Sequence, residues 1–383
     1  MGAKNNKISA FQFTVLGVLI SASLFEGVAS VFALESSMQN SWLTLIIASF
    51  IGFIPIGLII YIINYEPDKN IIEKINHLFG PLLGNIINFI LTICVFVILI
   101  TTLWSLVNFS EVKYLTETPP IFIGVVFMIT AIYAVIKGIE TIARSGEVLM
   151  YLYILFQVLI VLALVANIDI DNLFPIMEKG FSPILQSSVK FLTYIIPPFM
   201  LITIIPKSDV EENKKLTKYL INGYIISMFI MLLSFLVIIT VVGPHLADLY
   251  RFPSYYVIKK IHLTGFLENL ENILSILWVI TMYLCVCMSL HYTSTYVNKL
   301  FKVKNDWKRV IGIVIIAIIA IYFQNKYYYS SVIGIIIAKN TFPYVVGLTS
   351  AILIVIISIK IFFTNKSKKN QNQSKENQNY STT

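Results

Sequence analysis

A single carboxylate inside an apolar stretch is the side chain of this sequence best placed to bind or move a charged group. Glu26 lies in the mainly apolar run from Ile8 to Phe32, shortly after three small residues, Ser21-Ala22-Ser23. If residues 10–32 cross a membrane as one helix, Glu26 lies about one turn beyond mid-depth. A charge there costs roughly 2.5 to 3.5 kcal/mol on insertion scales, so Glu26 must face protein, water or ligand, or carry a proton.

The small residues around Glu26 allow two interpretations. In the first, the helix unwinds at the membrane midplane, where free backbone N–H and C=O groups meet a substrate. In the second, the helix is continuous, its small residues pack against a neighbour, and Glu26 points into a wet interior. Both interpretations fit the residues equally well.

No motif of an enzyme accompanies this carboxylate. The sequence has no HExxH, no GxSxG and no glycine-rich phosphate loop, and its four histidines lie in four different segments. Cys94, Cys285 and Cys287 fall inside apolar runs and are expected to be buried thiols rather than disulfides or metal ligands. We therefore expect neither catalysis nor a cofactor or metal site.

The elements that must position Glu26 are membrane helices. Of the 383 residues, 57% are hydrophobic and 13% are charged, and the apolar residues form long blocks, which is typical of a polytopic helical membrane protein. One transmembrane domain is expected over residues 1–363, followed by a disordered polar tail, 364–383. The blocks predict ten spans, at about residues 10–33, 42–63, 84–107, 120–136, 146–166, 184–205, 219–243, 266–297, 309–324 and 342–363.

The basic residues indicate the orientation of these spans. Of 28 Lys and Arg, 20 lie in or beside the N-tail, the loops after spans two, four, six and eight, and the C-tail. The positive-inside rule then places both termini in the cytoplasm. The net charge of +8 follows from this topology and from contact with anionic lipid, and no basic motif suggests nucleic acid.

Two short segments between the spans also carry helix signals. Residues 70–79 have an apolar face, with Asn70 and Glu73 at capping-box spacing and Gly80-Pro81 as a stop, so a helix is expected along the cytoplasmic surface. Residues 253–261 begin with proline and predict a short helix at the outer interface.

Span six contains a second interruption. Adjacent Pro197 and Pro198 remove two backbone donors inside an apolar run and predict a break or a hard kink. Spans one and six are five apart in a set of ten. Two five-helix repeats of opposite orientation would place their equivalent broken helices in this way.

Several stretches resemble the permease-like B subunits of bacterial endospore germination receptors. The segment from Phe266 to Trp278, with Glu268 and Glu271, resembles the opening of the eighth helix in that family. The likeness extends over about residues 8–363. Further stretches agree in order and spacing: Thr116-Glu-Thr-Pro-Pro120, Asp171 to Gly180, Gly243-Pro244 and Phe252-Pro253.

The resemblance implies a fold and a function. The family belongs to the amino acid, polyamine and organocation transporter superfamily, which implies an all-α, LeuT-like fold of two inverted five-helix repeats with helices one and six broken. It further implies a nutrient sensor in the spore inner membrane that acts with an A subunit and a lipoprotein C subunit. The germinant would bind among spans one, three, six and eight, and the expected lining is Ser21, Ala22, Ser23, Leu24, Phe25, Glu26, Trp104, Thr193, Tyr194, Pro197 and Tyr283.

The chain departs from the family pattern where a ligand would bind. Ser21, Ala22, Ser23 and Val28 stand where relatives usually have a glycine, a small residue, a second glycine and a later proline. In span six, Ile195 and Pro197 replace a frequent glycine and acidic residue. An amino acid is the first expectation for the germinant, and a cationic or amine-bearing molecule opposite Glu26 is the second. The alternative function is a secondary active transporter for an amino acid or polyamine, coupled to H⁺ or Na⁺.

Overall fold

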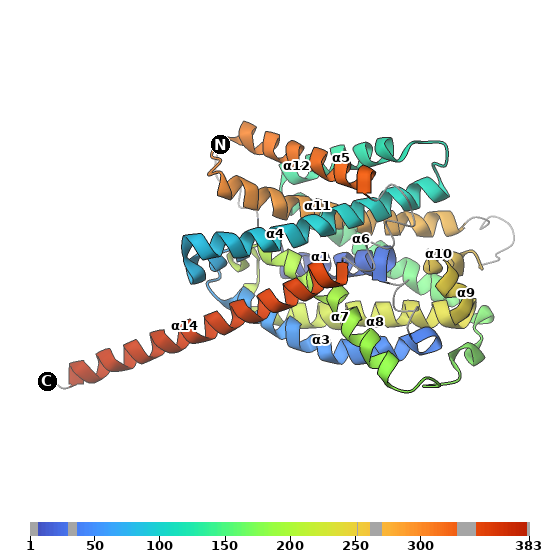
Figure 1. Cartoon of the computed structure of the whole chain (residues 1–383), viewed down its shortest axis with the longest axis horizontal. Helices are drawn as coiled ribbons and strands as arrows, with labels where there is room; N and C mark the ends of the chain where they lie inside the picture. The colour runs from blue at the N-terminus through green and yellow to red at the C-terminus, as the bar shows by residue number, and fades with distance from the viewer. Residues whose placement is uncertain (1–6, 30–36, 251, 261–269, 328–341, 381–383) are drawn as a thin grey trace.

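Long antiparallel helices form the whole architecture of the computed structural model, which describes residues 7–29, 37–250, 252–260, 270–327 and 342–380 (Figure 1). Eight of the described helical segments are long and apolar enough to cross a membrane, and α1 is a shorter apolar helix. Together with α12 they correspond to the ten predicted spans. Their bounds are α1 Ala10–Leu24, α3 Ser41–Asn64, α4 Ile71–Lys113, α5 Pro120–Lys137, α6 Ile139–Leu164, α7 Ser182–Leu201, α8 Leu216–Val242, α11 Leu270–Leu300, α12 Asp306–Tyr327 and α14 Thr349–Tyr380.

α1 lies in the middle of the bundle in Figure 1. It contacts α6, α7, α8 and α11, and apart from Phe11 and Gln12 every residue of α1 is buried. A helix that is apolar all round suits such a position. Large apolar side chains on the outer helices are exposed instead, among them Phe50 at 72% and Phe229 at 64%, as expected for faces that contact lipid.

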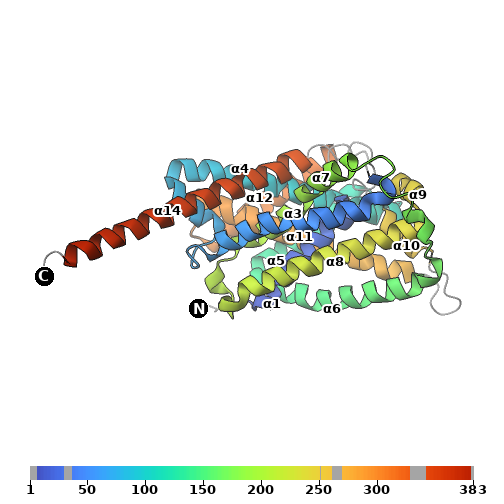
Figure 2. The same cartoon turned by 90° about the horizontal axis from the view of Figure 1, so that it is seen from below.

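The two ends of the bundle differ. The chain enters α1 and leaves through α14 at one end, whereas the short helices α9 (Pro244–Leu249) and α10 (Pro253–Ile258) cover the other (Figure 2). α10 confirms the predicted short helix that begins at Pro253. At the end that holds the chain termini, Ile8 pairs with the loop after α7, since its N–H donates to Asp209 O at 3.0 Å and its carbonyl accepts from Glu211 N at 2.8 Å. This pairing ties the start of span one to span six.

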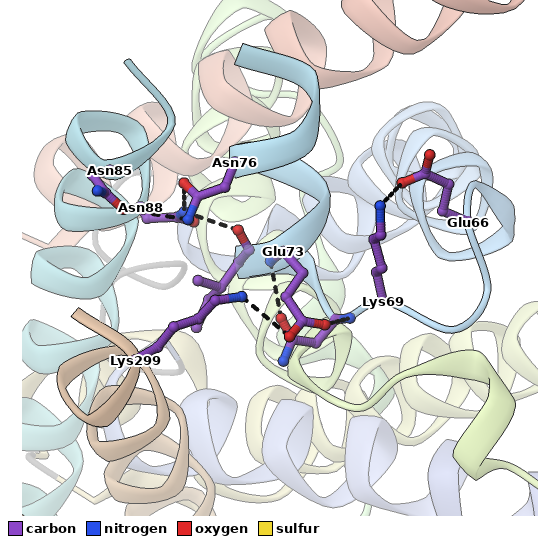
Figure 3. Close-up of polar contacts among 9 residues, drawn as sticks. Glu66, Lys69, Glu73, Asn76, Asn85, Asn88 and Lys299 are labelled. Carbon is purple, nitrogen blue, oxygen red and sulfur yellow. Dashed lines mark hydrogen bonds and ion pairs between the residues drawn. The ribbon is translucent and has the colours of Figure 1, made fainter. Parts of the chain in front are cut away.

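The predicted surface helix is confirmed at the start of α4. Asn70 and Glu73 form the reciprocal capping box, and Gly80, with φ 78° and ψ 173°, separates this first segment from the membrane span. The segment is fixed to its neighbours by the Lys299–Glu73 ion pair of 3.1 Å and by Asn88 Nδ2, which donates to Asn76 Oδ1 at 2.9 Å (Figure 3).

The two interrupted spans take forms that differ from the expectation. In span one the α-helix stays regular through Leu24 and then widens into a π-helical turn, Phe25–Ala29, that contains Glu26. In span six α7 remains helical across Pro197 and Pro198 and tightens into a 3₁₀ turn only at Ile202–Ile204. The prolines lack the donors for the carbonyls one turn earlier, but tight burial of this part of α7 keeps the helix together.

The polar tail also differs from the expected disorder. α14 continues as a helix through Tyr380 and projects beyond the bundle (Figure 1). Its apolar first half supplies the nucleus, and helix propagation from an existing turn needs only one hydrogen bond per added residue.

Candidate functional site

Glu26 is buried and contacts α10, one of the two short helices that cover the end of the bundle opposite the chain termini. Only 5% of the residue is exposed, and its Oε2 accepts a 2.5 Å hydrogen bond from Ser254 Oγ of α10. Among the described residues Glu26 forms no ion pair. The π-helical turn places this carboxylate where the regular α-helix has ended, and such turns are frequent at functional sites.

A small cavity adjoins the Glu26 carboxylate. Its volume of about 30 Å³ is enough for a water molecule and too small for an amino acid. The polar residues of its wall, besides Glu26, are Gln157 of α6, Ser234 of α8 and Ser254 of α10, and Trp278 of α11 closes one side. α10 supplies Ser254, Val257 and Ile258 to the wall of this cavity and so covers the Glu26 carboxylate.

This cavity lies among spans one, five, seven and eight rather than among spans one, three, six and eight. Gln157 and Ser254 are the residues that sequence reasoning missed. Gln157 carries a recognisable signal, because it is a lone amide in the apolar run of span five. Ser254 carries none, since its contact with Glu26 joins residues 228 positions apart.

Some predicted residues of span one form a second group, on the side of α4 and α11. Ser21 Oγ donates to Gly17 O of its own helix at 2.7 Å. Ser23 Oγ is buried and faces the Cys285 thiol. Cys285 Sγ in turn lies 3.6 Å from Thr102 Oγ1 of α4. Polar atoms of three spans thus meet next to the Ser21–Ser23 segment.

Aromatic rings connect the Phe25 end of span one to span six. The ring of Phe25 lies 5.1 Å from that of Phe235 and 6.4 Å from that of Phe191. Phe191 adjoins Tyr194 at 6.3 Å, and Tyr194 stacks on Phe342 at 5.0 Å with 5° between the planes. The predicted residues Phe25 and Tyr194 therefore belong to one continuous aromatic layer.

Two other predicted residues lie outside these groups. Thr193 packs against Gly347 in the π-helical turn Phe342–Leu348 and donates to Lys190 O at 2.6 Å. Tyr283 lies beside Thr130 of α5 and Cys287, whereas Cys285, on the opposite face of the same helix, turns toward α1. The face of span eight that meets α1 is therefore that of Cys285, and the ligand-binding role of Tyr283 stays a prediction. Ala22, Leu24, Trp104 and Pro197 are buried in their spans.

Comparison with known proteins gives a consistent result. The family model described as "Spore germination protein" (Spore_permease) matches residues 7–329 of the chain. Among curated proteins of Bacillus subtilis (strain 168), "Spore germination protein KB" is 26% identical over 319 residues, which are 80% of this chain and 84% of that protein. "Putative spore germination protein YfkT" is 25% identical over 286 residues, which are 75% and 78% of the two chains.

Two solved structures share the fold. MhsT, crystallised in complex with L-phenylalanine, superposes with a TM-score of 0.62 over 91% of this chain and 87% of its own, at 16% sequence identity. The manganese transporter of Eremococcus coleocola, solved as a point mutant, gives a TM-score of 0.53 over 91% of this chain and 77% of its own, at 12% identity. At such identities the likeness concerns the fold alone.

Proposed function

This chain belongs to the spore germination protein family, and we propose that it is the integral membrane subunit of a germination receptor and senses a nutrient germinant. The observation that carries the sensing role is the buried carboxylate of Glu26, which has no ion pair among the described residues and binds the outer cover through Ser254. Buried carboxylates at this depth are costly and usually serve a ligand or an ion.

The geometry suggests how binding would produce a signal. In the closed state the Ser254 hydroxyl is the donor to Glu26, and α10 is held against span one. An amino acid or another amine-bearing germinant brings an ammonium group, a stronger donor to a carboxylate than a neutral hydroxyl. Exchange of one donor for the other would free α10 and favour an open state, because a ligand shifts the equilibrium toward the state that it binds better.

Backbone hydrogen bonds at the inner end of the bundle indicate which end moves first. Ile8 is paired with the loop after α7, and Ser208 N–H of that loop donates to Pro67 O at 3.0 Å. Three connections of the inner end are thus tied together, whereas the cover at the outer end rests on side-chain contacts. We assign the first movement to the outer end and its readout to the A and C subunits.

Deletion of the gene tests this function. Spores that lack the chain are expected to lose the response to one nutrient, or one class of nutrients, in a panel of amino acids and amines, and to keep the response to calcium dipicolinate. The loss of optical density on germination is the measurement, and a wild-type copy should restore it. Deletion spores that answer every nutrient of the panel like the parent, in a strain without other receptors, would show that the chain is not a sensor.

The orientation of the chain is a separate part of the proposal. The 20 basic residues on one side support a cytoplasmic position for the end that holds both termini. A fluorescent reporter fused after Thr383 in the inner membrane of the spore should be protected from protease added to intact protoplasts. Cleavage of that reporter would reverse the topology.

A transporter is the second candidate function. A carboxylate at this depth, next to a cavity that can hold water, is also suited to proton coupling. A receptor and a transporter both need two conformational states around one binding site. They differ in whether the ligand crosses the membrane.

A further inference from the structure

Aromatic rings at the outer end of the bundle hold an ammonium group. Lys113, in the last turn of α4, places Nζ 4.4 Å from the ring centroid of Tyr255 and 4.6 Å from that of Tyr256. Tyr250 stacks on Tyr256 with centroids 3.8 Å apart. A cation is attracted to the face of an aromatic ring within about 6 Å of its centroid, so both rings act on the same charge.

The rings are the principal partners of this lysine. Lys113 makes no ion pair with any of the described carboxylates. Its Nζ donates to Tyr256 Oη at 3.5 Å, a distance at which a hydrogen bond is weak. The position is therefore suited to an ammonium group by its ring faces rather than by a countercharge.

The rings belong to the cover over Glu26. Tyr255 follows Ser254 in α10, and its ring lies 6.4 Å from that of Trp278, which lines the Glu26 cavity. The contacts that hold α10 therefore include Ser254 on Glu26 and the tyrosines on Lys113, besides the packing of α10 on α8 and α11.

We propose that Tyr255 and Tyr256 form a binding site for small organic ammonium ions, here called the ammonium box, and that Lys113 occupies it in the closed state. A free ammonium ion competes with Lys113 Nζ for the same ring faces, since Lys113 lies nearer to the Tyr255 centroid than Lys259, whose Nζ is 5.3 Å away. Its binding releases the contact between Lys113 and α10, one of the contacts that hold this helix in place. The effect of this release on sensing rests on the proposed function, whereas binding of an ammonium ion to the box does not.

The competition predicts an increase in affinity when the lysine is removed. With radiolabelled tetramethylammonium and the purified full-length chain in nanodiscs, Lys113→Met should bind the ion about tenfold more tightly than wild type, because the box is no longer occupied by the side chain. Lys260→Met is the matched control. It removes the same charge just after α10, where Lys260 is exposed, and should change the affinity less than about twofold because salt screens exposed charges.

Substitution of the tyrosine tests the ring itself. Tyr256→Leu in the Lys113→Met background should return the affinity to the wild-type level or below, whereas Tyr256→Phe keeps the ring and should bind like Lys113→Met alone. Equal affinities of Lys113→Met and Lys260→Met, or tight binding that survives Tyr256→Leu, would overturn the proposal. Binding is measured on the isolated chain, so such a result would overturn the ammonium box without bearing on the sensing role. Conversely, deletion spores that respond normally would overturn the sensing role without bearing on the ammonium box.

Discussion

Glu26→Gln should raise the germinant concentration needed for half-maximal germination by tenfold or more, while the protein stays at normal abundance in the membrane. Glutamine keeps the size of the side chain and can still accept the hydrogen bond from Ser254. It loses the charge that an ammonium group would bind. A tenfold shift corresponds to about 1.4 kcal/mol of lost binding or coupling free energy. The measurement is a dose–response curve of spores in which the variant is the only copy, with an immunoblot of the inner membrane.

Ser254→Ala is the matched variant, and the expected effect has the opposite sign. It removes the donor that holds α10 on Glu26 but leaves the carboxylate for the ligand. Loss of a hydrogen bond to a charged group weakens the closed state by roughly 1.5 to 3 kcal/mol, so less germinant should suffice. If both variants need more germinant, or if Glu26→Gln answers like wild type, the contact is structural and the ligand site has to lie elsewhere.

Gly347→Ala should destabilise the protein strongly. The π-helical turn before α14 lies so close to α7 that a Cβ on Gly347 would be 2.6 Å from Thr193 Cα, and still nearer to its Cβ. Backbone of α7 cannot move aside as a side-chain end would, so the turn itself must shift. Overpacking of this kind costs roughly 1 to 3 kcal/mol, and it would also disturb the Tyr194–Phe342 stack.

Thermal unfolding of the purified variants, followed by tryptophan fluorescence, measures this effect. Gly57→Ala in α3 is the control, because a Cβ there meets nothing within 4 Å. Alanine is a better helix former than glycine by about 1 kcal/mol, so Gly57→Ala should be neutral or slightly stabilising. Equal melting temperatures for wild type and Gly347→Ala would mean that α7 and the turn are not packed so closely.

The helices could be predicted from the sequence because hydropathy and local signals determine them. The ten apolar blocks, the capping box of Asn70 and Glu73, and the proline that starts α10 are local features, and the structure contains them all. Glu26 could also be recognised from the sequence as an unusual residue, since it is a carboxylate inside an apolar run. Its burial follows from the central position of α1.

The surroundings of Glu26 could not be predicted in the same way. Ser254 reaches Glu26 only because the chain folds back over the outer end, and no periodicity reports such a contact. The face of α11 that meets α1 could not be predicted for a related reason. α11 has apolar residues on every face, so the sequence does not reveal which face turns toward α1, and the structure selects Cys285. The two prolines of span six mislead because burial holds the helix together across them.

One measurement tests most directly whether this chain senses its ligand rather than transports it. The nutrient identified with the deletion spores, radiolabelled, is added to sealed proteoliposomes that contain the chain alone, under an imposed proton or sodium gradient. The receptor account predicts saturable retention of label that is the same in sealed and detergent-permeabilised vesicles and that falls tenfold or more in affinity with Glu26→Gln. Accumulation that grows with time, depends on the gradient and disappears on permeabilisation would contradict it and establish a transporter.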